Sequence, residues 1–269
     1  MSKKFKLGVI GAGFMASSII KGVVNAKVLD PSNIIVSDLN DSSLEKVSLF
    51  GVSTTKDNLY LTNNSEFILF AVKPQNIDSV LYGINSSNAN KFISIMAGVK
   101  KRRIKDVFPN ALVCRCMPNT PCAIGSGVIG ADISDYTEKK DVDFIKSFLE
   151  AISKVVYLSE DKLNAVTGVS GSSPAYFYLF LKGIIESGVK HGLSFEDSKT
   201  LALSTMIGAG KMVELNHDKT LDDLITAVCS EGGTTIEAIN VYNDSGLSNI
   251  TEKAIDACIK RAKELEESI

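Results

Sequence analysis

Short apolar runs and amphipathic segments alternate over the first 159 residues of the chain. The apolar runs predict strands over residues 7–10, 34–37, 52–54, 67–72, 92–96, 112–116, 128–129 and 155–158. Helical spacing of the apolar positions predicts helices over residues 14–20, 42–50 and 137–151. A run such as FILFAV, apolar at every position, is typical of a strand covered on both faces. The pattern therefore predicts an open α/β sheet over residues 1–159.

The pattern changes after Ser159, where the strand signals stop. Apolar positions with helical spacing predict helices over residues 161–169, 175–191 and 247–269. Capping-box spacing marks the starts of further helices at Ser194 with Asp197 and at Thr220 with Asp223. Small residues at 171–173 are expected to break the first helix, with Pro174 in the first position of the next. Residues 160–269 are therefore predicted to form an all-α second domain.

The helix predicted over residues 175–191 is apolar nearly all round at its start, in residues 176–181. A helix of this kind has to be buried on every side. The second domain has only about 110 residues, so we expect a partner subunit to cover the helix and the chain to be an obligate oligomer.

A glycine turn joins the first predicted strand to the first predicted helix. Gly11 permits the sharp turn, Gly13 lets the backbone approach a diphosphate, and Ala16 allows close packing of helix on strand. A diphosphate is expected at the helix N-terminus, where free N–H groups favour negative charge. Asp38 ends the second strand 25 residues after Gly13, where an acidic residue would bind a ribose hydroxyl. An ordinary βα turn and a simple Asp turn are the alternative interpretations.

A second glycine motif, CSEGGTTIEAI, occupies residues 229–239 of the helical half. Thr234 and Glu237 have capping-box spacing, which predicts Thr234 as the cap and Thr235 in the first helical turn. Gly232 and Gly233 allow an open loop whose N–H groups point outward. Together with the Ser230 and Thr235 hydroxyls, this arrangement predicts a small anion site with a hydroxyl donor beside it. An ordinary glycine loop before a capped helix is the alternative.

Composition narrows the class of protein. The net charge is −2, and the basic residues do not cluster beyond residues 100–103, so a nucleic-acid partner is not expected. The five cysteines lack paired CxxC spacing and follow no signal-peptide pattern, so we expect no metal site and reduced thiols in the cytoplasm. The longest apolar run, residues 175–181, is far shorter than the roughly 18 residues that a membrane helix needs.

Six sequence blocks occur in an order and spacing that resemble one enzyme family. They are GVIGAGFMASSII, AVKPQ, IMAGV, RCMPNTP, AVTGVSGSSPAYFY and VCSEGGTTIEAI. Together they are similar to pyrroline-5-carboxylate reductase over nearly the whole chain. The resemblance implies a Rossmann-type dinucleotide-binding domain (residues 1–159) followed by an all-α dimerisation and substrate domain (residues 160–269). It also implies the last step of proline synthesis, the reduction of 1-pyrroline-5-carboxylate to L-proline by NADPH or NADH.

The resemblance assigns roles to residues that match the family's motifs. Cofactor contacts fall on Ile10, Gly11, Ala12, Gly13, Phe14, Met15, Asn58, Ala71, Val72, Lys73, Pro74, Ala97 and Gly98. Ser37 and Asp38 are added to these because they end the second strand. Substrate contacts fall on Ser230, Gly232, Gly233, Thr234 and Thr235, and Asn119 is expected to lie between the two ligands.

Two departures from the family pattern affect the predicted sites. Glu231 stands where the family has proline, and we expect its side chain to point away from the substrate carboxylate. The segment after the second strand also lacks the basic residue of some NADPH-preferring members. Asp38 would repel a 2′-phosphate, whereas Ser37 and Asn40 could hydrogen-bond one, which leaves the nucleotide preference open.

The predicted chemistry requires positioning and one hydrogen-bond donor. A cyclic imine accepts hydride at carbon 5 once its nitrogen is protonated or strongly hydrogen-bonded. Thr235 is the candidate donor, with a role in orientation and proton relay from water, while the 233–235 amides hold the carboxylate. His191 and His217 are not expected to take part, because the first ends a helix and the second lies in a polar connection.

Two other functions remain as alternatives. A β-hydroxyacid dehydrogenase or another imine reductase would share the fold, but a hydroxyacid enzyme would need the pattern GxxxKxxxN early in its second domain. Here Lys182 stands alone, outside that pattern. A non-catalytic dinucleotide sensor is the second alternative, and an assay of NADPH oxidation with the imine would distinguish it from the enzyme.

Overall fold

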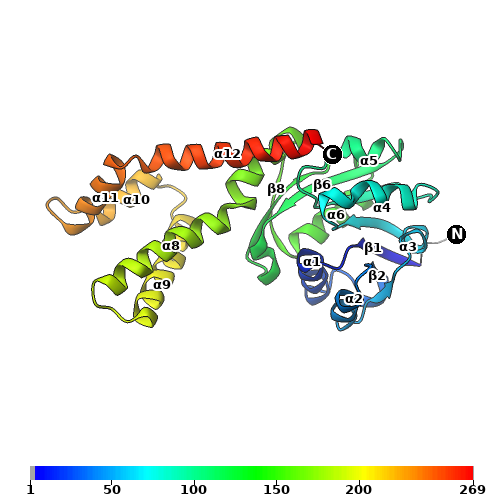
Figure 1. Ribbon diagram of the computed structural model, residues 1–269, viewed down its shortest axis with the longest axis horizontal. Coiled ribbons are helices and arrows are strands. Elements are labelled where there is room, and N and C mark those ends of the chain that lie inside the picture. Colours follow the sequence, from blue (N-terminus) through cyan, green and yellow to red (C-terminus); the bar gives the residue numbers. More distant parts are fainter. Residues whose placement is uncertain (1–3, 269) are drawn as a thin grey trace. The chain divides into compact units, whose positions relative to one another are not determined.

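The computed structural model describes residues 4–268 of the chain, which form two compact units (Figure 1). The first unit holds the chain up to Ser172 together with the stretch from Cys258 onward, and the second holds Ser173–Ala257. The division expected at residues 159 and 160 therefore differs from the compact units. Residues 160–172 and the end of the chain pack with the sheet because they carry side chains that bind it, as described below.

An eight-stranded sheet forms the centre of the first unit. Its strands are β1 (Phe5–Ile10), β2 (Ile34–Ser37), β3 (Ser53–Thr55), β4 (Ser65–Phe70), β5 (Lys91–Ser94), β6 (Leu112–Pro118), β7 (Gly127–Asp132) and β8 (Ser153–Tyr157). The order is β3-β2-β1-β4-β5-β6-β7-β8, and every neighbouring pair is parallel except β6 with β7. This is the Rossmann-type α/β sheet that was predicted, with an antiparallel step near one edge.

Helices cover both faces of the sheet. The α-helices of this unit are α1 (Phe14–Asn25), α2 (Asp41–Ser48), α3 (Asn58–Asn64), α4 (Ile77–Ile84), α5 (Lys101–Lys105), α6 (Lys139–Glu150) and α7 (Leu163–Val166). Short 3₁₀ turns are η1 (Pro31–Asn33), η2 (Pro74–Asn76), η3 (Thr120–Ile124) and η4 (Glu160–Lys162). Phe67 and Leu69 of β4 pack in one core cluster with α1, α2 and α6. Ile68 and Phe70 pack in the other with α3, α4 and α5. Successive residues of this strand therefore face opposite cores, which explains why FILFAV is apolar throughout.

The predicted break at residues 171–173 is confirmed at Ser172, which belongs to no helix. Before it the chain continues from α7 through a π-helical turn, η5 (Thr167–Gly171), and after it α8 (Ser173–Lys190) begins, so that Pro174 is the second helical residue and not the first. Gly171, the last residue of the turn, lies against β6, where a Cβ atom would stand 2.6 Å from Met117 Cε. This glycine therefore lies at a close contact between the turn and the sheet.

The second unit is helical, as predicted. It contains α8, α9 (Phe195–Leu215), α10 (Leu221–Val228), α11 (Thr234–Asp244) and the start of α12 (Leu247–Ser268), whose end belongs to the first unit. Two predicted caps are confirmed, because Ser194 Oγ accepts from the Asp197 amide at 3.1 Å and Thr220 forms a capping box with Asp223. The predicted cap at Thr234 is wrong.

The cap of α11 is Gly233, and Thr234 is already helical. The Gly233 amide donates to the Ser230 carbonyl oxygen at 2.9 Å, which closes a turn that starts the helix one residue early.

Large apolar side chains of α8 are exposed in the single chain. Phe177, Tyr178 and Leu179 are 59%, 64% and 72% exposed. Monomeric proteins rarely expose contiguous apolar surface of this kind. The single chain thus leaves uncovered the helix for which the sequence predicts a partner subunit.

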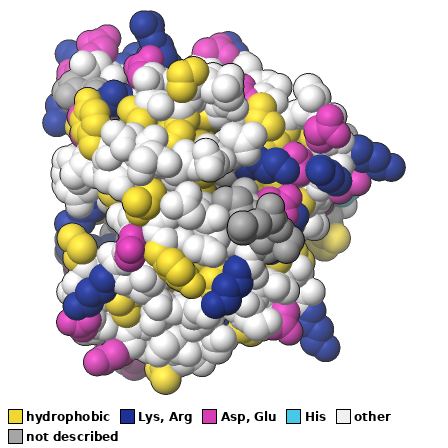
Figure 2. Space-filling view, turned by 90° about the vertical axis from the view of Figure 1, so that its right-hand side faces the viewer, with side chains coloured by type: hydrophobic (Ala, Val, Ile, Leu, Met, Phe, Trp, Pro, Cys, Tyr) yellow, Lys and Arg dark blue, Asp and Glu magenta, His cyan; other side chains and the backbone are white. Residues whose placement is uncertain are grey.

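Charged groups of both signs and apolar side chains are interspersed on the face shown in Figure 2. Within residues 4–268, no helix combines the length and the hydropathy that crossing a bilayer requires.

A buried ionic cluster fixes the end of α12 to the sheet. Arg115 of β6 donates to Glu266 Oε1 at 2.8 Å and to Glu160 Oε1 at 3.1 Å. Asn164 donates to Glu266 Oε2 at 3.0 Å. The side chains of Arg115 and Glu266 are only 4% and 5% exposed. Such a pair is costly to break, because removing one partner leaves a buried charge without compensation.

This cluster predicts an acid-sensitive contribution to stability. Burial disfavours the charged form of Glu266, but hydrogen bonds from Asn164 and Arg115 outweigh it, so the pKa lies below its usual value. A lowered folded-state pKa stabilises the fold above the unfolded pKa, and this stabilisation is lost as the pH falls through the folded value. We expect Glu266→Gln to melt at a lower temperature than the wild type near pH 7, with the gap narrowing toward acid pH.

Thermal melts over a pH series measure this gap. Glu267→Gln is the matched control, since Glu267 is exposed. A gap that is independent of pH, or one equally large for Glu267→Gln, would contradict the assigned role of the Glu266 charge.

Candidate functional site

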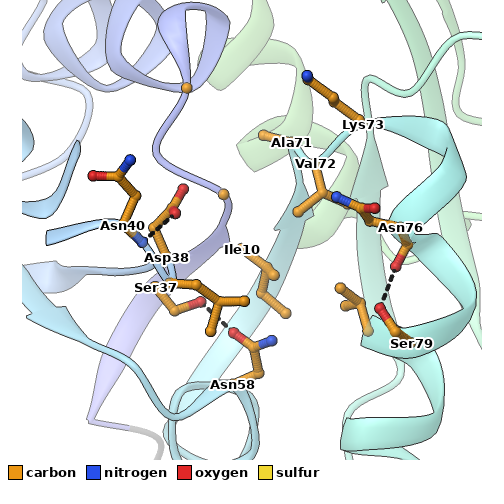
Figure 3. Close-up of a pocket in the computed structure, with 14 residues that line it drawn as sticks. Ile10, Ser37, Asp38, Asn40, Asn58, Ala71, Val72, Lys73, Asn76 and Ser79 are labelled. Atoms are coloured by element: carbon orange, nitrogen blue, oxygen red, sulfur yellow. Dashed lines mark hydrogen bonds between the residues drawn. The ribbon is translucent and has the colours of Figure 1, made fainter. Parts of the chain in front are cut away.

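A pocket of about 750 Å³ opens at the carboxyl ends of β1, β2 and β4 (Figure 3). Its size falls in the range of about 300–1,000 Å³ that is common for small-molecule and cofactor sites. The residues that line it are Ile10, Gly11, Gly13, Ser37, Asp38, Leu39, Asn40, Asn58, Ala71, Val72, Lys73, Asn76, Ser79 and Val80. Nine of them are among the fifteen predicted cofactor contacts.

The two glycines of the first turn are explained by different features. Gly11 has φ +101°, and a Cβ atom there would stand 2.7 Å from the Ala71 carbonyl oxygen. Its amide donates to the Ser37 carbonyl oxygen at 2.8 Å. The turn therefore contacts the end of β2 through this bond and the residue after β4 through Ala71. Gly13 caps α1 with φ −69°, and a Cβ atom there would meet no heavy atom within 4 Å. The fold thus requires Gly11, whereas Gly13 borders open space at a helix N-terminus suited to a diphosphate.

Polar groups at the end of β2 form one wall of the pocket. Asp38 accepts from the Ala12 amide at 2.7 Å and from the Asn40 amide at 2.9 Å. The Ser37 hydroxyl donates to Asn58 Oδ1 at 2.6 Å (Figure 3). The bonds from the Ala12 and Asn40 amides hold the Asp38 carboxylate at the pocket wall.

The loop after β4 and the start of α4 form the opposite wall (Figure 3). There the Ser79 hydroxyl donates to the Asn76 carbonyl oxygen at 2.9 Å. Five lining residues are absent from the predicted cofactor contacts: Leu39, Asn40, Asn76, Ser79 and Val80. Asn76, Ser79 and Val80 could have been predicted from the helix that starts directly after the KPQ loop. This helix start lies at the pocket because β4 neighbours β1 in the sheet.

Six predicted cofactor contacts do not line this pocket. They are Ala12, Phe14, Met15, Pro74, Ala97 and Gly98. Ala12 is buried and contributes its amide to Asp38. Phe14 is 69% exposed on the first turn of α1. Gly98, at φ +71°, lies against α12, where a Cβ atom would stand 3.2 Å from Leu265 Cβ. The cofactor roles of these six residues stay predictions.

Asn119 lies at a junction between three segments of the first unit. Its Oδ1 accepts from the Val128 amide at 3.0 Å, and its Nδ2 donates to the Ser170 carbonyl oxygen at 3.3 Å. The side-chain amide therefore joins the loop after β6 to β7 and to the π-helical turn. Its predicted contact with substrate stays a prediction, and these bonds give it a structural role as well.

The second glycine motif forms a tight corner before α11. Gly232 is left-handed at φ +67°. A Cβ atom at Gly233 would clash with Ser230 Oγ and stand 3.0 Å from the Ser230 carbonyl oxygen, so a larger residue there would require the serine side chain to move. Ser230, Thr234 and Thr235 are exposed, at the N-terminus of an eleven-residue helix. Free amides and hydroxyls thus gather at one point, as an anion site requires.

Three thiols of the first unit, those of Cys114, Cys116 and Cys122, are buried and form no disulfide. The hydrogen bond between the Cys114 and Cys116 thiols, and then burial, raise the pKa of the Cys114 thiol well above its usual value. Burial also raises the pKa of Cys122. All five cysteines are free, and among residues 4–268 no group of three or more His, Cys, Asp and Glu side chains is arranged to hold a metal ion. A thiol with a raised pKa is a poor nucleophile.

Two family models match this chain. Residues 160–265 match the model described as pyrroline-5-carboxylate reductase dimerisation. Residues 6–98 match the model described as NADP oxidoreductase, coenzyme F420-dependent.

Named relatives and solved structures cover almost the whole chain. The pyrroline-5-carboxylate reductase of Synechocystis is 34% identical over 97% of this chain and 98% of its own length. The corresponding protein of Pisum sativum is 31% identical over 98% and 97%. The structure of a pyrroline-5-carboxylate reductase from Coxiella burnetii has a TM-score of 0.88 at 31% identity, covering 98% of this chain and 99% of that one.

A Plasmodium falciparum pyrroline carboxylate reductase, solved with NADP bound, has a TM-score of 0.87 at 26% identity and covers 99% of this chain and 100% of its own. The identity to the Synechocystis and Pisum sativum relatives exceeds 30% over nearly the full length of the chain, which shows the family to which the chain belongs. The chain belongs to the pyrroline-5-carboxylate reductase family.

Proposed function

We propose that the chain reduces 1-pyrroline-5-carboxylate to L-proline with hydride from NADPH, the last step of proline biosynthesis, and that NADH can also serve. The named relatives that align over nearly all of the chain carry this proposal. The pocket at the ends of β1, β2 and β4 and the glycine corner before α11 are proposed as the two sites that the reaction needs.

The residues of the pocket fit a dinucleotide. The open space at Gly13 would admit a diphosphate, and the N-terminus of the twelve-residue α1 would bind its charge. Ile10, Ala71 and Val72 supply apolar surface on one side, and Ser37, Asp38 and Asn58 supply polar groups on the other. When bound, the nicotinamide supplies the hydride, and the protein contributes position and electrostatics.

The corner before α11 is proposed to hold the imino acid. The amides of Thr234 and Thr235 would bind the carboxylate, together with the Ser230 hydroxyl and the backbone around Gly232, whereas the Gly233 amide that was also expected to bind it donates to the Ser230 carbonyl oxygen. The Thr235 hydroxyl would donate to the ring nitrogen and relay a proton from water. A threonine is too weak an acid to protonate the imine outright, so its role is orientation and polarisation. Glu231 lies exposed on the same turn, and we propose that it points away from the carboxylate.

The two domains are proposed to have different roles. Residues 1–159 bind the nucleotide, and residues 160–269 hold the substrate and mediate dimerisation, within a dimer or a larger assembly of dimers. A match to a dimerisation model over residues 160–265 supports this division. Five free cysteines fit the reducing environment of the cytoplasm, which we propose as the location.

The oligomer is testable by sedimentation velocity. We expect the wild type to sediment as a dimer or larger species. Leu179→Glu places a charge on an apolar helix side chain that is 72% exposed in the single chain, and it should shift the population toward monomer. A wild type that sediments as a monomer, or a variant with unchanged mass, would contradict self-association through α8.

An assay of nucleotide oxidation tests the function directly. Purified protein is mixed with 1-pyrroline-5-carboxylate and NADPH or NADH, and both nucleotide oxidation and proline formation are measured. Proline formed in step with oxidation supports the proposal. Nucleotide binding without oxidation would identify the dinucleotide sensor, and oxidation only with other imines or with β-keto acids would identify a different reductase.

A further inference from the structure

The end of β2 carries a negative charge where the pocket would receive the adenosine ribose. In dinucleotide-binding folds, an acidic residue at this place binds the ribose hydroxyls, whereas NADP-binding chains accommodate the 2′-phosphate with a basic residue. Asp38 lines the pocket, and its two carboxylate oxygens accept from the Ala12 amide at 2.7 Å and the Asn40 amide at 2.9 Å. Because each oxygen is bound to backbone, the carboxylate cannot turn away without losing both bonds.

The neighbouring polar groups are uncharged, and each already makes a hydrogen bond. Ser37 is fully buried, and its hydroxyl donates to Asn58 at 2.6 Å. The Asn40 side-chain oxygen accepts from the Ser42 and Ser43 amides, at 2.9 and 3.3 Å, as the cap of α2. These two residues were the candidates for hydrogen-bonding a 2′-phosphate. Neither one supplies a positive charge to offset Asp38.

Basic side chains near this wall are also committed or distant. Lys73 is the basic residue among those that line the pocket, but it follows β4, which lies on the other side of β1 from β2. Figure 3 shows Lys73 and Asp38 on opposite sides of the pocket. Lys56, which follows β3, is paired with Asp41 at 2.7 Å. A 2′-phosphate would therefore meet the Asp38 charge without a nearby cation to compensate it.

We infer that Asp38 is a specificity-determining residue that makes this chain use NADH at least as well as NADPH. The inference rests on the proposed reductase function and adds the nucleotide preference to it. The 2′-hydroxyl of NADH can donate to a carboxylate oxygen, which keeps a free lone pair beside its backbone bond. The 2′-phosphate of NADPH brings like charge to the same place, and like charges in contact disfavour binding.

Fluorescence titration of the full-length protein with NADH and NADPH, without imine, measures this preference apart from catalysis. We expect the wild type to bind NADH at least as tightly as NADPH. Asp38→Asn keeps one acceptor oxygen and removes the charge, and it should shift the ratio of the two dissociation constants toward NADPH by about tenfold or more. A damaged glycine turn would weaken both nucleotides together, so the ratio isolates the charge.

Glu45→Gln is the matched control, because Glu45 lies on α2 in the following segment, does not line the pocket and is exposed. The control should change the ratio by less than about twofold, as expected for a solvent-screened charge. Tighter wild-type binding of NADPH than NADH, an unchanged ratio in Asp38→Asn, or an equal shift in Glu45→Gln would each overturn the inference. A protein that binds both nucleotides but leaves the imine unreduced would instead refute the proposed function.

Discussion

Replacing Thr235 by alanine is expected to lower kcat for imine reduction about ten- to hundredfold, the usual loss when one donor or proton-relay group is removed. Thr235 is the second residue of α11 and is exposed at the helix N-terminus beside the glycine corner. As hydride reaches carbon 5, electron density moves to the ring nitrogen, so a donor aimed at that atom stabilises the transition state more than the ground state. The affinity for NADPH should stay the same, because the nucleotide pocket is built from other residues.

The serine variant separates the hydroxyl from the rest of the side chain. Thr235→Ser keeps the donor and should keep most of the turnover, while Thr235→Ala should not. Steady-state kinetics with varied imine and saturating NADPH give kcat and KM for each variant, and fluorescence titration checks nucleotide binding. Unchanged kcat in Thr235→Ala would remove the proposed role, and equal losses in both variants would assign the effect to the methyl group.

The sheet was the part of the fold most open to prediction from sequence. Parallel strands buried on both faces are apolar throughout, and this signal is local, so β2 was predicted with the bounds that the structure gives. The antiparallel step between β6 and β7 was not predicted, because strand direction depends on pairing between distant segments. The short α3 was missed, although Asp57 caps it through the Tyr60 amide.

Helix boundaries near glycines were predicted only in part. The break expected at residues 171–173 lies at Ser172, but the π-helical turn before it was not predicted. Thr234 has the sequence spacing of a cap, but the turn between Ser230 and Gly233 makes Gly233 the cap and Thr234 the first helical residue. Capping-box spacing does not report the turn that precedes the helix, so it cannot distinguish these two arrangements.

The predicted nucleotide site was likewise predictable only in part. Residues of the glycine turn and the end of β2 were predicted because their motif has a physical meaning along the chain itself. Asn76 and Ser79 line the pocket only because β4 lies beside β1, which brings the start of α4 to the same edge. In the helical half, the sequence predicted that α8 must be covered by a partner. The large apolar side chains of α8 that are exposed in the single chain agree with this prediction.

Alanine at the two glycines of the first turn is expected to give opposite phenotypes. Gly13→Ala should fold with nearly unchanged stability, because its Cβ atom would meet nothing within 4 Å. It should weaken NADPH binding about ten- to hundredfold, since that open space is where a diphosphate would approach the backbone. Gly11→Ala should instead destabilise the protein itself.

The cost of Gly11→Ala has two sources. A non-glycine residue at φ +101° is strained by about 1–3 kcal/mol, and the new Cβ atom would stand 2.7 Å from the Ala71 carbonyl oxygen, which is backbone and cannot move aside cheaply. Thermal denaturation and nucleotide titration of both variants separate the two effects. A Gly13→Ala protein that melts much lower than the wild type, or one that binds NADPH normally, would show that the space at Gly13 is not the diphosphate site.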